Sequence, residues 1–228
     1  MTPDDFTALG VTLRLALITT LILLVLGVPL GWWLARSRSR FTTAVEAVVA
    51  LPLVLPPTVL GFYLLIALAP TGIAGGAWRA LGGEGLAFTF SGLVIGSVLY
   101  SMPFVVQPLQ NAFAAVGERT LEAASTLRAS PLDRFFSVTL PLSRSGVITA
   151  ATLGFAHTLG EFGVVLMIGG NIPGETQVLS IAIYDHVESL EYAQAHLLSA
   201  LLLLFSFVVL YLVYRMQGRG GASGARRD

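Results

Sequence analysis

The sequence predicts an all-α protein, a polytopic bundle of about five helices that cross a lipid bilayer. Hydrophobic residues make up 55% of the 228 positions and charged residues only 11%, which is far from the balance of a soluble globular domain. The apolar residues gather in blocks of about 20 or more, the length that a helix needs to cross the hydrocarbon core. The segments between these blocks are rich in glycine, proline and charge. We therefore expect a membrane protein with several spans.

Five apolar blocks are the expected spans, because each is long enough at about 1.5 Å per residue to cross the bilayer. They cover approximately residues 11–34, 45–69, 90–116, 146–168 and 195–214, within one membrane domain of residues 1–217. The first block is expected to be retained, since Asp4 and Asp5 precede it and a signal peptide would begin with basic residues. Residues 218–228 are rich in Gly and Arg and are expected to form a flexible cytoplasmic tail.

The arginines predict the orientation, because basic residues in short loops stay on the cytoplasmic side. Eleven of the thirteen arginines fall in segments on one side of the predicted bundle: Arg36, Arg38, Arg40, Arg119, Arg128, Arg134, Arg144, Arg215, Arg219, Arg226 and Arg227. The opposite loops are mostly acidic. The N-terminus is therefore expected outside and the C-terminus in the cytoplasm, for a multi-pass protein of the inner (cytoplasmic) cell membrane.

The cytoplasmic loop of residues 117–141 reads as two short helices. The stretch 118–127 is rich in helix formers, Ser130 can cap a second helix that starts at Pro131, and Pro141 is expected to end that piece. The second piece contains Leu132, Phe135 and Phe136 and is more apolar than a loop facing only water. It is expected to dock, either on the ends of its own helices or on another protein.

At this loop the chain resembles the inner-membrane subunits of ABC importers, whose signature runs from Glu-Ala-Ala through a Gly to an apolar-x-Leu-Pro ending. Arg128 stands where that family usually has Gly, which puts the local turn geometry in question because Gly accepts a positive φ. The resemblance implies a type I importer fold and a coupling loop that contacts a separate ATP-hydrolysing subunit. The implied contact residues are Glu122, Ala123, Ala124, Arg128, Pro131, Leu132, Phe135, Phe136 and Pro141.

Three further runs are similar to the molybdate permease subunits: 51–61 (LPLVLPPTVLG), 159–163 (LGEFG) and 170–176 (GNIPGET). Sulfate permease subunits share Gly-Glu-Phe-Gly but are less similar around 171–176, and tungstate cannot be separated from molybdate by sequence. The resemblance implies a molybdate importer built as a homodimer with two cytoplasmic ATP-binding subunits. It also implies an extracytoplasmic molybdate-binding protein that meets the outer loop at Asn171, Pro173, Gly174, Glu175 and Thr176.

Polar and helix-breaking residues inside the blocks are candidates for a pathway or gate. Prolines cannot donate backbone hydrogen bonds, so the second block should bend or unwind where they cluster. A carboxylate repels an oxyanion, so Glu161 is expected to pair with His157, four positions earlier, or with neighbouring helices, or to act in a gate. For the uncharged polar residues the alternative is an interhelical hydrogen bond. The candidates are Pro56, Pro57, Thr58, Ser101, Gln107, Asn111, His157, Thr158 and Glu161.

Several functions are disfavoured by composition. The chain has no Lys, so a phosphate-binding loop for ATP hydrolysis is not expected and the chain is predicted to be a transport subunit, not an enzyme. It has no Cys, its histidines lack the His-Glu-x-x-His spacing, and we predict no metal site and no cofactor. A formal net charge of zero disfavours nucleic acid. A secondary transporter and a membrane metalloenzyme remain as lesser alternatives, the former without an evident internal repeat.

Overall fold

A computed structural model describes residues 1–221, with side chains described through Arg215, and within this range the chain is entirely helical with no strand. The long helices are α1 (Pro3–Arg36), α2 (Arg40–Val54), α3 (Pro57–Leu68), α5 (Phe90–Ala115), α9 (Arg144–Leu159) and α12 (Tyr192–Gly221). Shorter helices are α4 (Ile73–Ala80), α6 (Glu118–Thr126), α7 (Pro131–Asp133), the π-helix η1 (Arg134–Thr139), α8 (Leu140–Leu142), α10 (Gly163–Gly169) and α11 (Leu179–Glu188).

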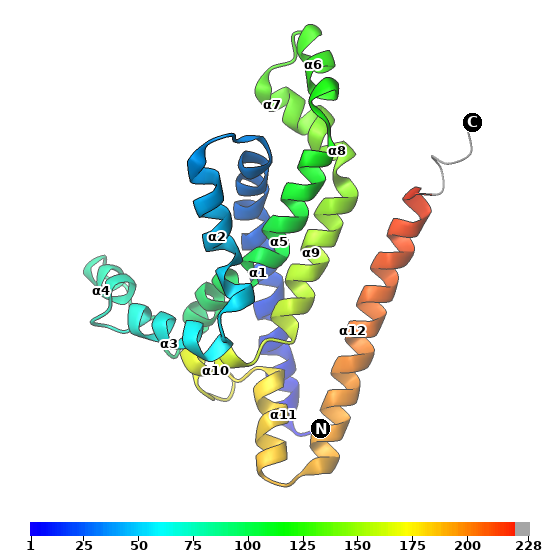
Figure 1. Ribbon diagram of the computed structural model, residues 1–228. Coiled ribbons are helices and arrows are strands. Elements are labelled where there is room, and N and C mark those ends of the chain that lie inside the picture. The colour runs from blue at the N-terminus through cyan, green and yellow to red at the C-terminus, as the bar shows by residue number, and fades with distance from the viewer. Residues whose placement is uncertain (222–228) are drawn as a thin grey trace.

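Helices α1, α5 and α9 form the centre of the molecule (Figure 1). Glycines let them approach closely, as small residues do between membrane helices. A Cβ atom at Gly154 of α9 would lie 2.5 Å from a methyl of Val105 on α5, and one at Gly31 of α1 would lie 3.0 Å from Cβ of Leu109. Val105 and Leu109 are fully buried at this junction. The tight packing makes these three helices the frame on which the polar residues are placed.

Two of the expected spans are broken. Helix α2 ends at Val54 and α3 begins at Pro57, with Leu55 in an extended conformation; Pro56 and Pro57 have no N–H to continue the helical ladder. Helices α9 and α10 are bent by 60° at residues 160–162. The bend in the second block therefore appears where the prolines predict it. The fourth block, expected as one span over 146–168, forms two helices instead.

By length and composition, four helical segments among the described residues could cross a membrane, or up to five if the bent α9–α10 pair is one span. The four are Pro3–Arg36, Pro57–Ala80, Phe90–Ala115 and Tyr192–Arg215. The segment Pro57–Ala80 differs from the expected span 45–69, because the break at Pro56 separates α2 from α3 and α4 follows closely. Helix α12 runs to Gly221, so the expected tail begins inside it; residues 222–228 lie outside the described part.

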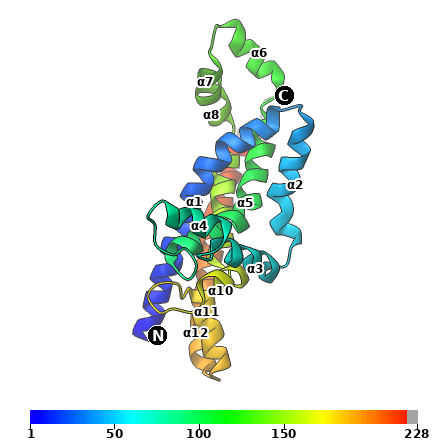
Figure 2. The ribbon, with the colours of Figure 1, turned by 90° about the vertical axis from the view of Figure 1, so that its left-hand side faces the viewer.

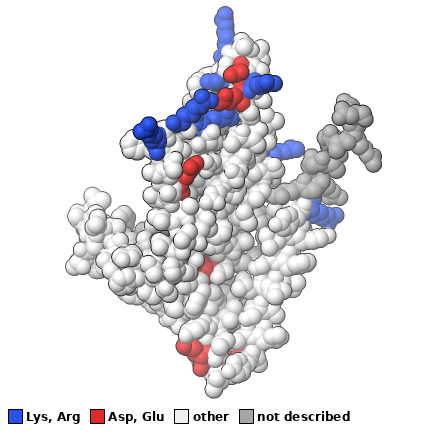
Figure 3. Space-filling view, in the orientation of Figure 1, with Lys and Arg blue, Asp and Glu red and all other residues white. Residues whose placement is uncertain are grey.

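The remaining elements surround the central three helices. In Figure 1, α3 and α4 project to one side, α12 stands apart on the other, and α6–α8 cap one end. Figure 2 places α4 in front of the central helices, which agrees with this arrangement. The kind of charged side chain differs between the two ends of the long axis. Arg side chains gather over the end formed by α6–α8 and the α1–α2 connection, while acidic side chains lie at the opposite end near α11 (Figure 3). The two ends of the bundle are thus chemically different.

Candidate functional site: a coupling face, two cavities and an outer loop

The face formed by α6, α7, η1 and α8 begins as the sequence predicts. Helix α6 covers Glu118–Thr126, and the Ser130 side chain caps α7 by accepting a hydrogen bond from the Asp133 N–H at 3.1 Å. Pro131 occupies the first helical position, where its missing N–H costs nothing. Two short helices meeting at a turn are therefore present.

Arg128 adopts the left-handed conformation at that turn, with φ of 60°. Its N–H donates to the Ser125 carbonyl at 2.9 Å, and the Ala129 N–H donates to the Ala124 carbonyl at 3.2 Å. A residue with a Cβ pays about 1–2 kcal/mol in this region. The turn therefore keeps a glycine-like backbone although Arg occupies the position.

Pro141 does not end the second piece, contrary to the expectation. The helical path continues from α7 through the π-helix η1 into α8, which contains Pro141. In η1 the Leu140 N–H bonds to the Phe135 carbonyl, five residues earlier. This wider turn lies just before the proline ring, where a normal helix would place a carbonyl in steric conflict with it. The π-turn thus explains why the helix passes through Pro141.

The apolar residues of this face divide into two groups. Leu132 and Phe136 are 72% and 61% exposed. The ring of Phe135 instead packs against Trp32 of α1 and Phe113 of α5, with ring centroids 5.3 and 5.9 Å apart. The resemblance implies one contact surface that includes both Phe135 and Phe136, whereas in the structure only the Phe136 ring faces outward.

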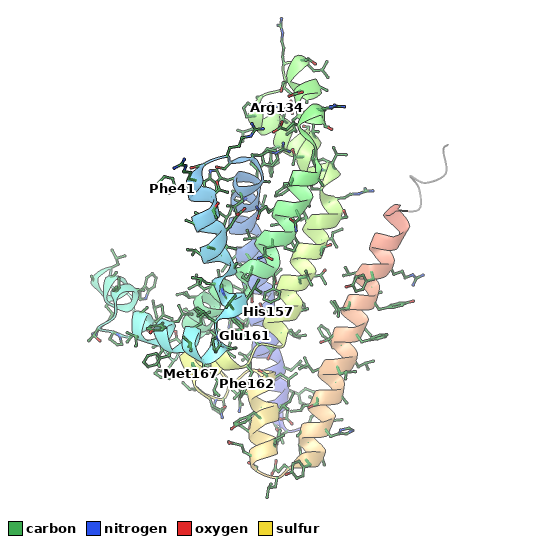
Figure 4. The ribbon with its side chains drawn as sticks, in the orientation of Figure 1. Phe41, Arg134, His157, Glu161, Phe162 and Met167 are labelled. Atoms are coloured by element: carbon green, nitrogen blue, oxygen red, sulfur yellow. The ribbon has the colours of Figure 1, made fainter. Side chains whose placement is uncertain are left out.

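The remaining predicted contact residues are mostly on the surface. Glu122 and Ala123 of α6 are exposed, as are Pro131 and Pro141, and Ala124 is half-buried. Figure 4 shows Arg134 at the same end of the molecule. Its guanidinium donates to the Ser125 hydroxyl at 2.6 Å and ties η1 back to α6. The face is therefore a connected unit with an exposed outer surface.

A cavity of about 660 Å³ lies where the two broken spans meet. Close packing holds the breaks together, since a Cβ at Gly163 would lie 2.7 Å from Cβ of Pro57. Four of the predicted pathway residues line this cavity, namely Pro57, Thr58, His157 and Glu161. Pro56 lies at the same break and is exposed. The residues lining the cavity are Pro57, Thr58, Tyr100, Ala156, His157, Gly160, Glu161, Phe162 and Gly163.

Ser101, His157 and Thr158 form a hydrogen-bonded group between α5 and α9. The Ser101 Oγ lies 2.9 Å from His157 Nδ1 and 3.0 Å from the Thr158 hydroxyl, which also donates to the Gly154 carbonyl. The His157 ring stacks on Phe104 with centroids 3.8 Å apart. Ser101 and Thr158 are buried and satisfied, so in this conformation they make the interhelical bonds named above as the alternative to a pathway role.

Glu161 is not paired with His157, although both were expected on one helix face. The helix ends at Leu159, so Glu161 leaves α9 and the four-residue spacing no longer aligns the two side chains (Figure 4). Both carboxylate oxygens are buried and have no hydrogen-bond partner among the described residues. Its main chain is engaged instead: the Glu161 N–H donates to the Thr158 carbonyl at 3.4 Å, and the Glu161 carbonyl accepts from the Ser180 hydroxyl at 2.6 Å. The expected pairing with His157 is therefore wrong.

A second cavity, of about 460 Å³, lies between α2 and α5 and is lined by Gln107 and Asn111. Glu46 and Gln110 also line this cavity, and Gln110 Nε2 donates a hydrogen bond to Glu46 Oε1 at 2.6 Å. Sequence reasoning missed both residues. Glu46 is an acid inside an apolar block, and the signal that singled out Glu161 would have found it as well.

The loop between α10 and α11 is held by polar contacts. Asn171 Nδ2 donates to Asp185 Oδ2 at 2.6 Å, and Pro173, Gly174 and Glu175 are exposed. Thr176 is fully buried, contrary to its expected place on the contact surface: its hydroxyl donates to the Gly169 carbonyl at 2.7 Å and accepts from the Ile172 N–H at 3.1 Å. Thr176 therefore closes the loop from within.

His186 anchors this end of the molecule. Its Nε2 lies 2.9 Å from Asp5 Oδ1 at the start of α1, and its Nδ1 lies 2.8 Å from Glu191 Oε2. The hydrogen bond to Asp5 raises the pKa of His186 above its ordinary value, against the opposing effect of burial, and the bond to Glu191 adds to the rise. Among the described residues, neither these three side chains nor any other group of three His, Cys, Asp or Glu residues is placed so that it could hold a metal ion.

Comparison with known proteins identifies the family. A family model described as "Binding-protein-dependent transport system inner membrane component" matches residues 27–219. The chain is 62% identical over 214 residues to the molybdenum transport system permease protein ModB of Azotobacter vinelandii, covering 94% of this chain and 95% of that protein. It is 35% identical to the protein of the same name from Haemophilus influenzae, covering 81% of each.

The fold agrees with this sequence relationship. A chain of a bacterial alginate ABC transporter, solved in complex with an alginate pentasaccharide-bound periplasmic protein, matches with a TM-score of 0.77. The match covers 96% of this chain and 80% of that one at 16% identity, so it demonstrates a shared fold alone. The chain belongs to the family of binding-protein-dependent transport system inner membrane components.

Proposed function

We propose that this chain is the membrane-spanning subunit of an ABC importer that moves molybdate into the cytoplasm. The observation that supports the substrate most strongly is 62% identity, over nearly the full length of both chains, to a molybdenum transport permease. Family membership implies two kinds of partner, a substrate-binding protein and ATP-binding subunits. The chain contributes the path through the membrane, and the partner subunits supply the energy.

In this proposal the end formed by α6–α8 lies in the cytoplasm and the α11 end lies outside. The arginine-rich surface at the first end supports that orientation, because basic residues are retained on the cytoplasmic side (Figure 3). The ATP-binding subunit would contact α6 and α7 through the exposed side chains of Glu122, Leu132 and Phe136. Leu132 and Phe136 expose more apolar surface than a loop facing only water needs.

The pathway would be completed by a second copy of the chain. Neither cavity is fully enclosed, and one copy contributes few helices to enclose a path. Thr58, Gln107 and Asn111 line these cavities with neutral hydrogen-bonding groups, which can solvate an oxyanion without holding it too tightly to release. His157 and Glu161 lie at the bend of α9–α10 and would belong to a gate, since a carboxylate is a poor ligand for an anion.

The binding protein would meet the outer end at Asn171, Pro173, Gly174 and Glu175. The exposed loop is held in one shape from beneath by Thr176 and Asp185. A rigid loop loses less conformational freedom on docking than a flexible one. The acidic character of this end suits contact with a protein better than capture of a free anion.

The test is reconstitution of the chain in proteoliposomes with its own ATP-binding subunit and binding protein. We expect uptake of molybdate that requires ATP and the binding protein, with sulfate a poor competitor. Tungstate should compete, because it matches molybdate in size, charge and shape. Uptake of sulfate in preference to molybdate would reject the proposed substrate, and uptake without ATP would reject the importer. A stoichiometry measurement on the purified complex should find two copies of this chain; a single copy would reject the homodimer.

A further inference from the structure

Three buried polar side chains near the α9–α10 bend have no hydrogen-bond partner among the described residues. They are Thr19 of α1, Ser97 of α5 and Glu161, with both carboxylate oxygens of Glu161 unpaired. Thr19 and Ser97 are fully buried and Glu161 is 5% exposed. Unsatisfied buried polar atoms are costly and uncommon, so three at one level of a membrane domain require an explanation.

The packing of the central helices places these side chains together. A Cβ at Gly27 of α1 would lie 3.2 Å from Val105 of α5. Thr19 is eight residues before Gly27 in α1, and Ser97 is eight residues before Val105 in α5, so both lie the same distance from this contact toward the outer end. Leu15 and Leu93, one turn further out, pack in the same cluster and continue the register. Thr19 therefore lies at the level of Ser97.

Glu161 reaches the same level from the third helix. A Cβ at Gly154 of α9 would contact Val105, α9 continues from there to Leu159, and Glu161 follows two residues beyond its end. The Ser97 hydroxyl faces the Glu161 carboxyl closely enough to interact, yet their geometry does not make a hydrogen bond. The carboxylate and the Ser97 hydroxyl are therefore neighbours, and the buried Thr19 hydroxyl lies at the same level; these three side chains are named here the Glu161 cluster.

This cluster has no positive charge of its own. The ion pairs among the described residues are Arg38–Glu118, His186–Asp5 and His186–Glu191, and none involves Glu161. The titratable neighbours are Tyr100 from α5 and His157 from α9, and His157 Nδ1 is bonded to Ser101 instead. An uncompensated carboxylate is expensive inside a membrane protein.

We propose that the Glu161 cluster is a binding site for one monovalent cation, either a proton or an alkali ion. A single carboxylate calls for a single positive charge, and carboxylate and hydroxyl oxygens are the donors that hard cations prefer. Sites of this chemistry form where membrane helices are broken and carbonyls leave the helical ladder, as at the end of α9. The inference concerns a ligand other than the transported anion and does not depend on its identity.

Cation binding at this position would be linked to the conformation of the bent span. Glu161 also lines the 660 Å³ cavity beside Pro57 and Thr58, so a movement of α10 against α3 would change its access to water. A cation held in the present conformation would stabilise the bent state, and its release would favour another. The site therefore provides a means of linking transport to cation concentration.

The test uses infrared spectroscopy and thermal unfolding of the purified full chain in lipid nanodiscs. The probes are pH, sodium chloride and potassium chloride, with choline chloride to hold the ionic strength constant. The key variant is Glu161→Gln, which keeps the shape and removes the charge. The matched control is Glu46→Gln, an acid on α2 whose carboxylate already has a partner in Gln110.

Either of two results supports the proposal. If the occupant is a proton, the wild type and Glu46→Gln show the carbonyl stretch of a protonated acid that Glu161→Gln lacks, and sodium leaves the unfolding midpoint unchanged. If it is an alkali ion, the midpoint of the wild type and Glu46→Gln rises with sodium or potassium, and the rise is lost in Glu161→Gln.

The proposal is overturned if the Glu161 carboxyl is ionised and the midpoint responds equally to each salt in all three proteins. Should Glu161→Gln fail to fold, Ser97→Ala provides the second readout because it retains the acid. It should shift the protonated-acid band or weaken the alkali-ion response at least severalfold, and an unchanged spectrum and response would also reject the site.

Discussion

His186 Nε2 lies 2.9 Å from Asp5 Oδ1 and so joins α11 to the first turn of α1, residues that are 181 positions apart in the chain. Asp5 is buried and its second carboxylate oxygen accepts from the Thr2 N–H at 2.6 Å. The contact fixes where the N-terminal end of α1 lies against α11. Its strength depends on the proton that His186 donates.

Stability should therefore fall as the pH rises. The pKa of His186 is raised in the folded protein, so its bonds contribute fully below the ordinary pKa of about 6.5 and are lost as the pH rises through the raised folded value. We expect the thermal midpoint to decrease as the pH rises above about 6.5, and to decrease less in His186→Asn. The control is His196→Asn, an exposed position on α12, which should follow the wild type. Parallel curves for the wild type and His186→Asn would contradict the assignment.

Phe135 and Phe136 should behave differently although they are adjacent. Phe135→Ala removes a ring that packs on Trp32 and Phe113, and should cost about 2 kcal/mol, roughly half the loss at a fully buried Phe. Phe136→Ala removes an exposed ring and should leave the thermal midpoint unchanged while weakening binding of the ATP-binding subunit. Thermal unfolding and co-purification of the two subunits measure these outcomes. Equal loss of stability in both variants would mean that the two rings share one environment.

Arg128→Gly should stabilise the turn between α6 and α7. Gly accepts the φ of 60° without a Cβ penalty, and after its own entropic cost the net gain should be about 0.5–1 kcal/mol. Hydrogen exchange of residues 124–131 should slow by about two- to fivefold, since about 1.4 kcal/mol corresponds to tenfold. Arg128→Ala keeps the Cβ and is the control. If Ala slows exchange as much as Gly does, the gain comes from loss of the long side chain and not from the backbone.

Much of the helical architecture could be predicted because bilayer length and apolar composition constrain it so strongly. The break before Pro57 was visible as well, since prolines remove backbone donors regardless of tertiary context. The break at residues 160–162 has no proline, and its local signals, Gly160 and Gly163, are residues that continuous membrane helices also contain. It depends on Gly163 meeting Pro57 of another helix, a contact that sequence spacing does not reveal.

The candidate site divides in the same way. The cap at Ser130 is a local feature that residue types alone predict. The positive φ of Arg128 is not, since the turn was questioned only because the resembled family has Gly at that position. The separation of Phe135 from Phe136, and the burial of Thr176, depend on which neighbours surround each side chain. The predicted pairing of Glu161 with His157 was wrong because it assumed an unbroken helix through both residues. Tertiary contacts therefore decide which polar residues are structural.

Substitution at Gly163 should separate the two broken spans. In Gly163→Ala the new Cβ would lie 2.7 Å from Cβ of Pro57, and relieving that contact should cost about 1–3 kcal/mol because backbone must move on one side. Gly160→Ala is the matched control on the other side of Glu161, since its Cβ would meet nothing nearer than 3.8 Å. We expect Gly163→Ala to lower both the thermal midpoint and the transport rate, and Gly160→Ala to change the midpoint little. If Gly163→Ala folds with unchanged stability and transports normally, the close approach of α3 and α10 is not needed for either. A loss of transport with an unchanged midpoint would instead place the requirement in the movement of α10 past Pro57.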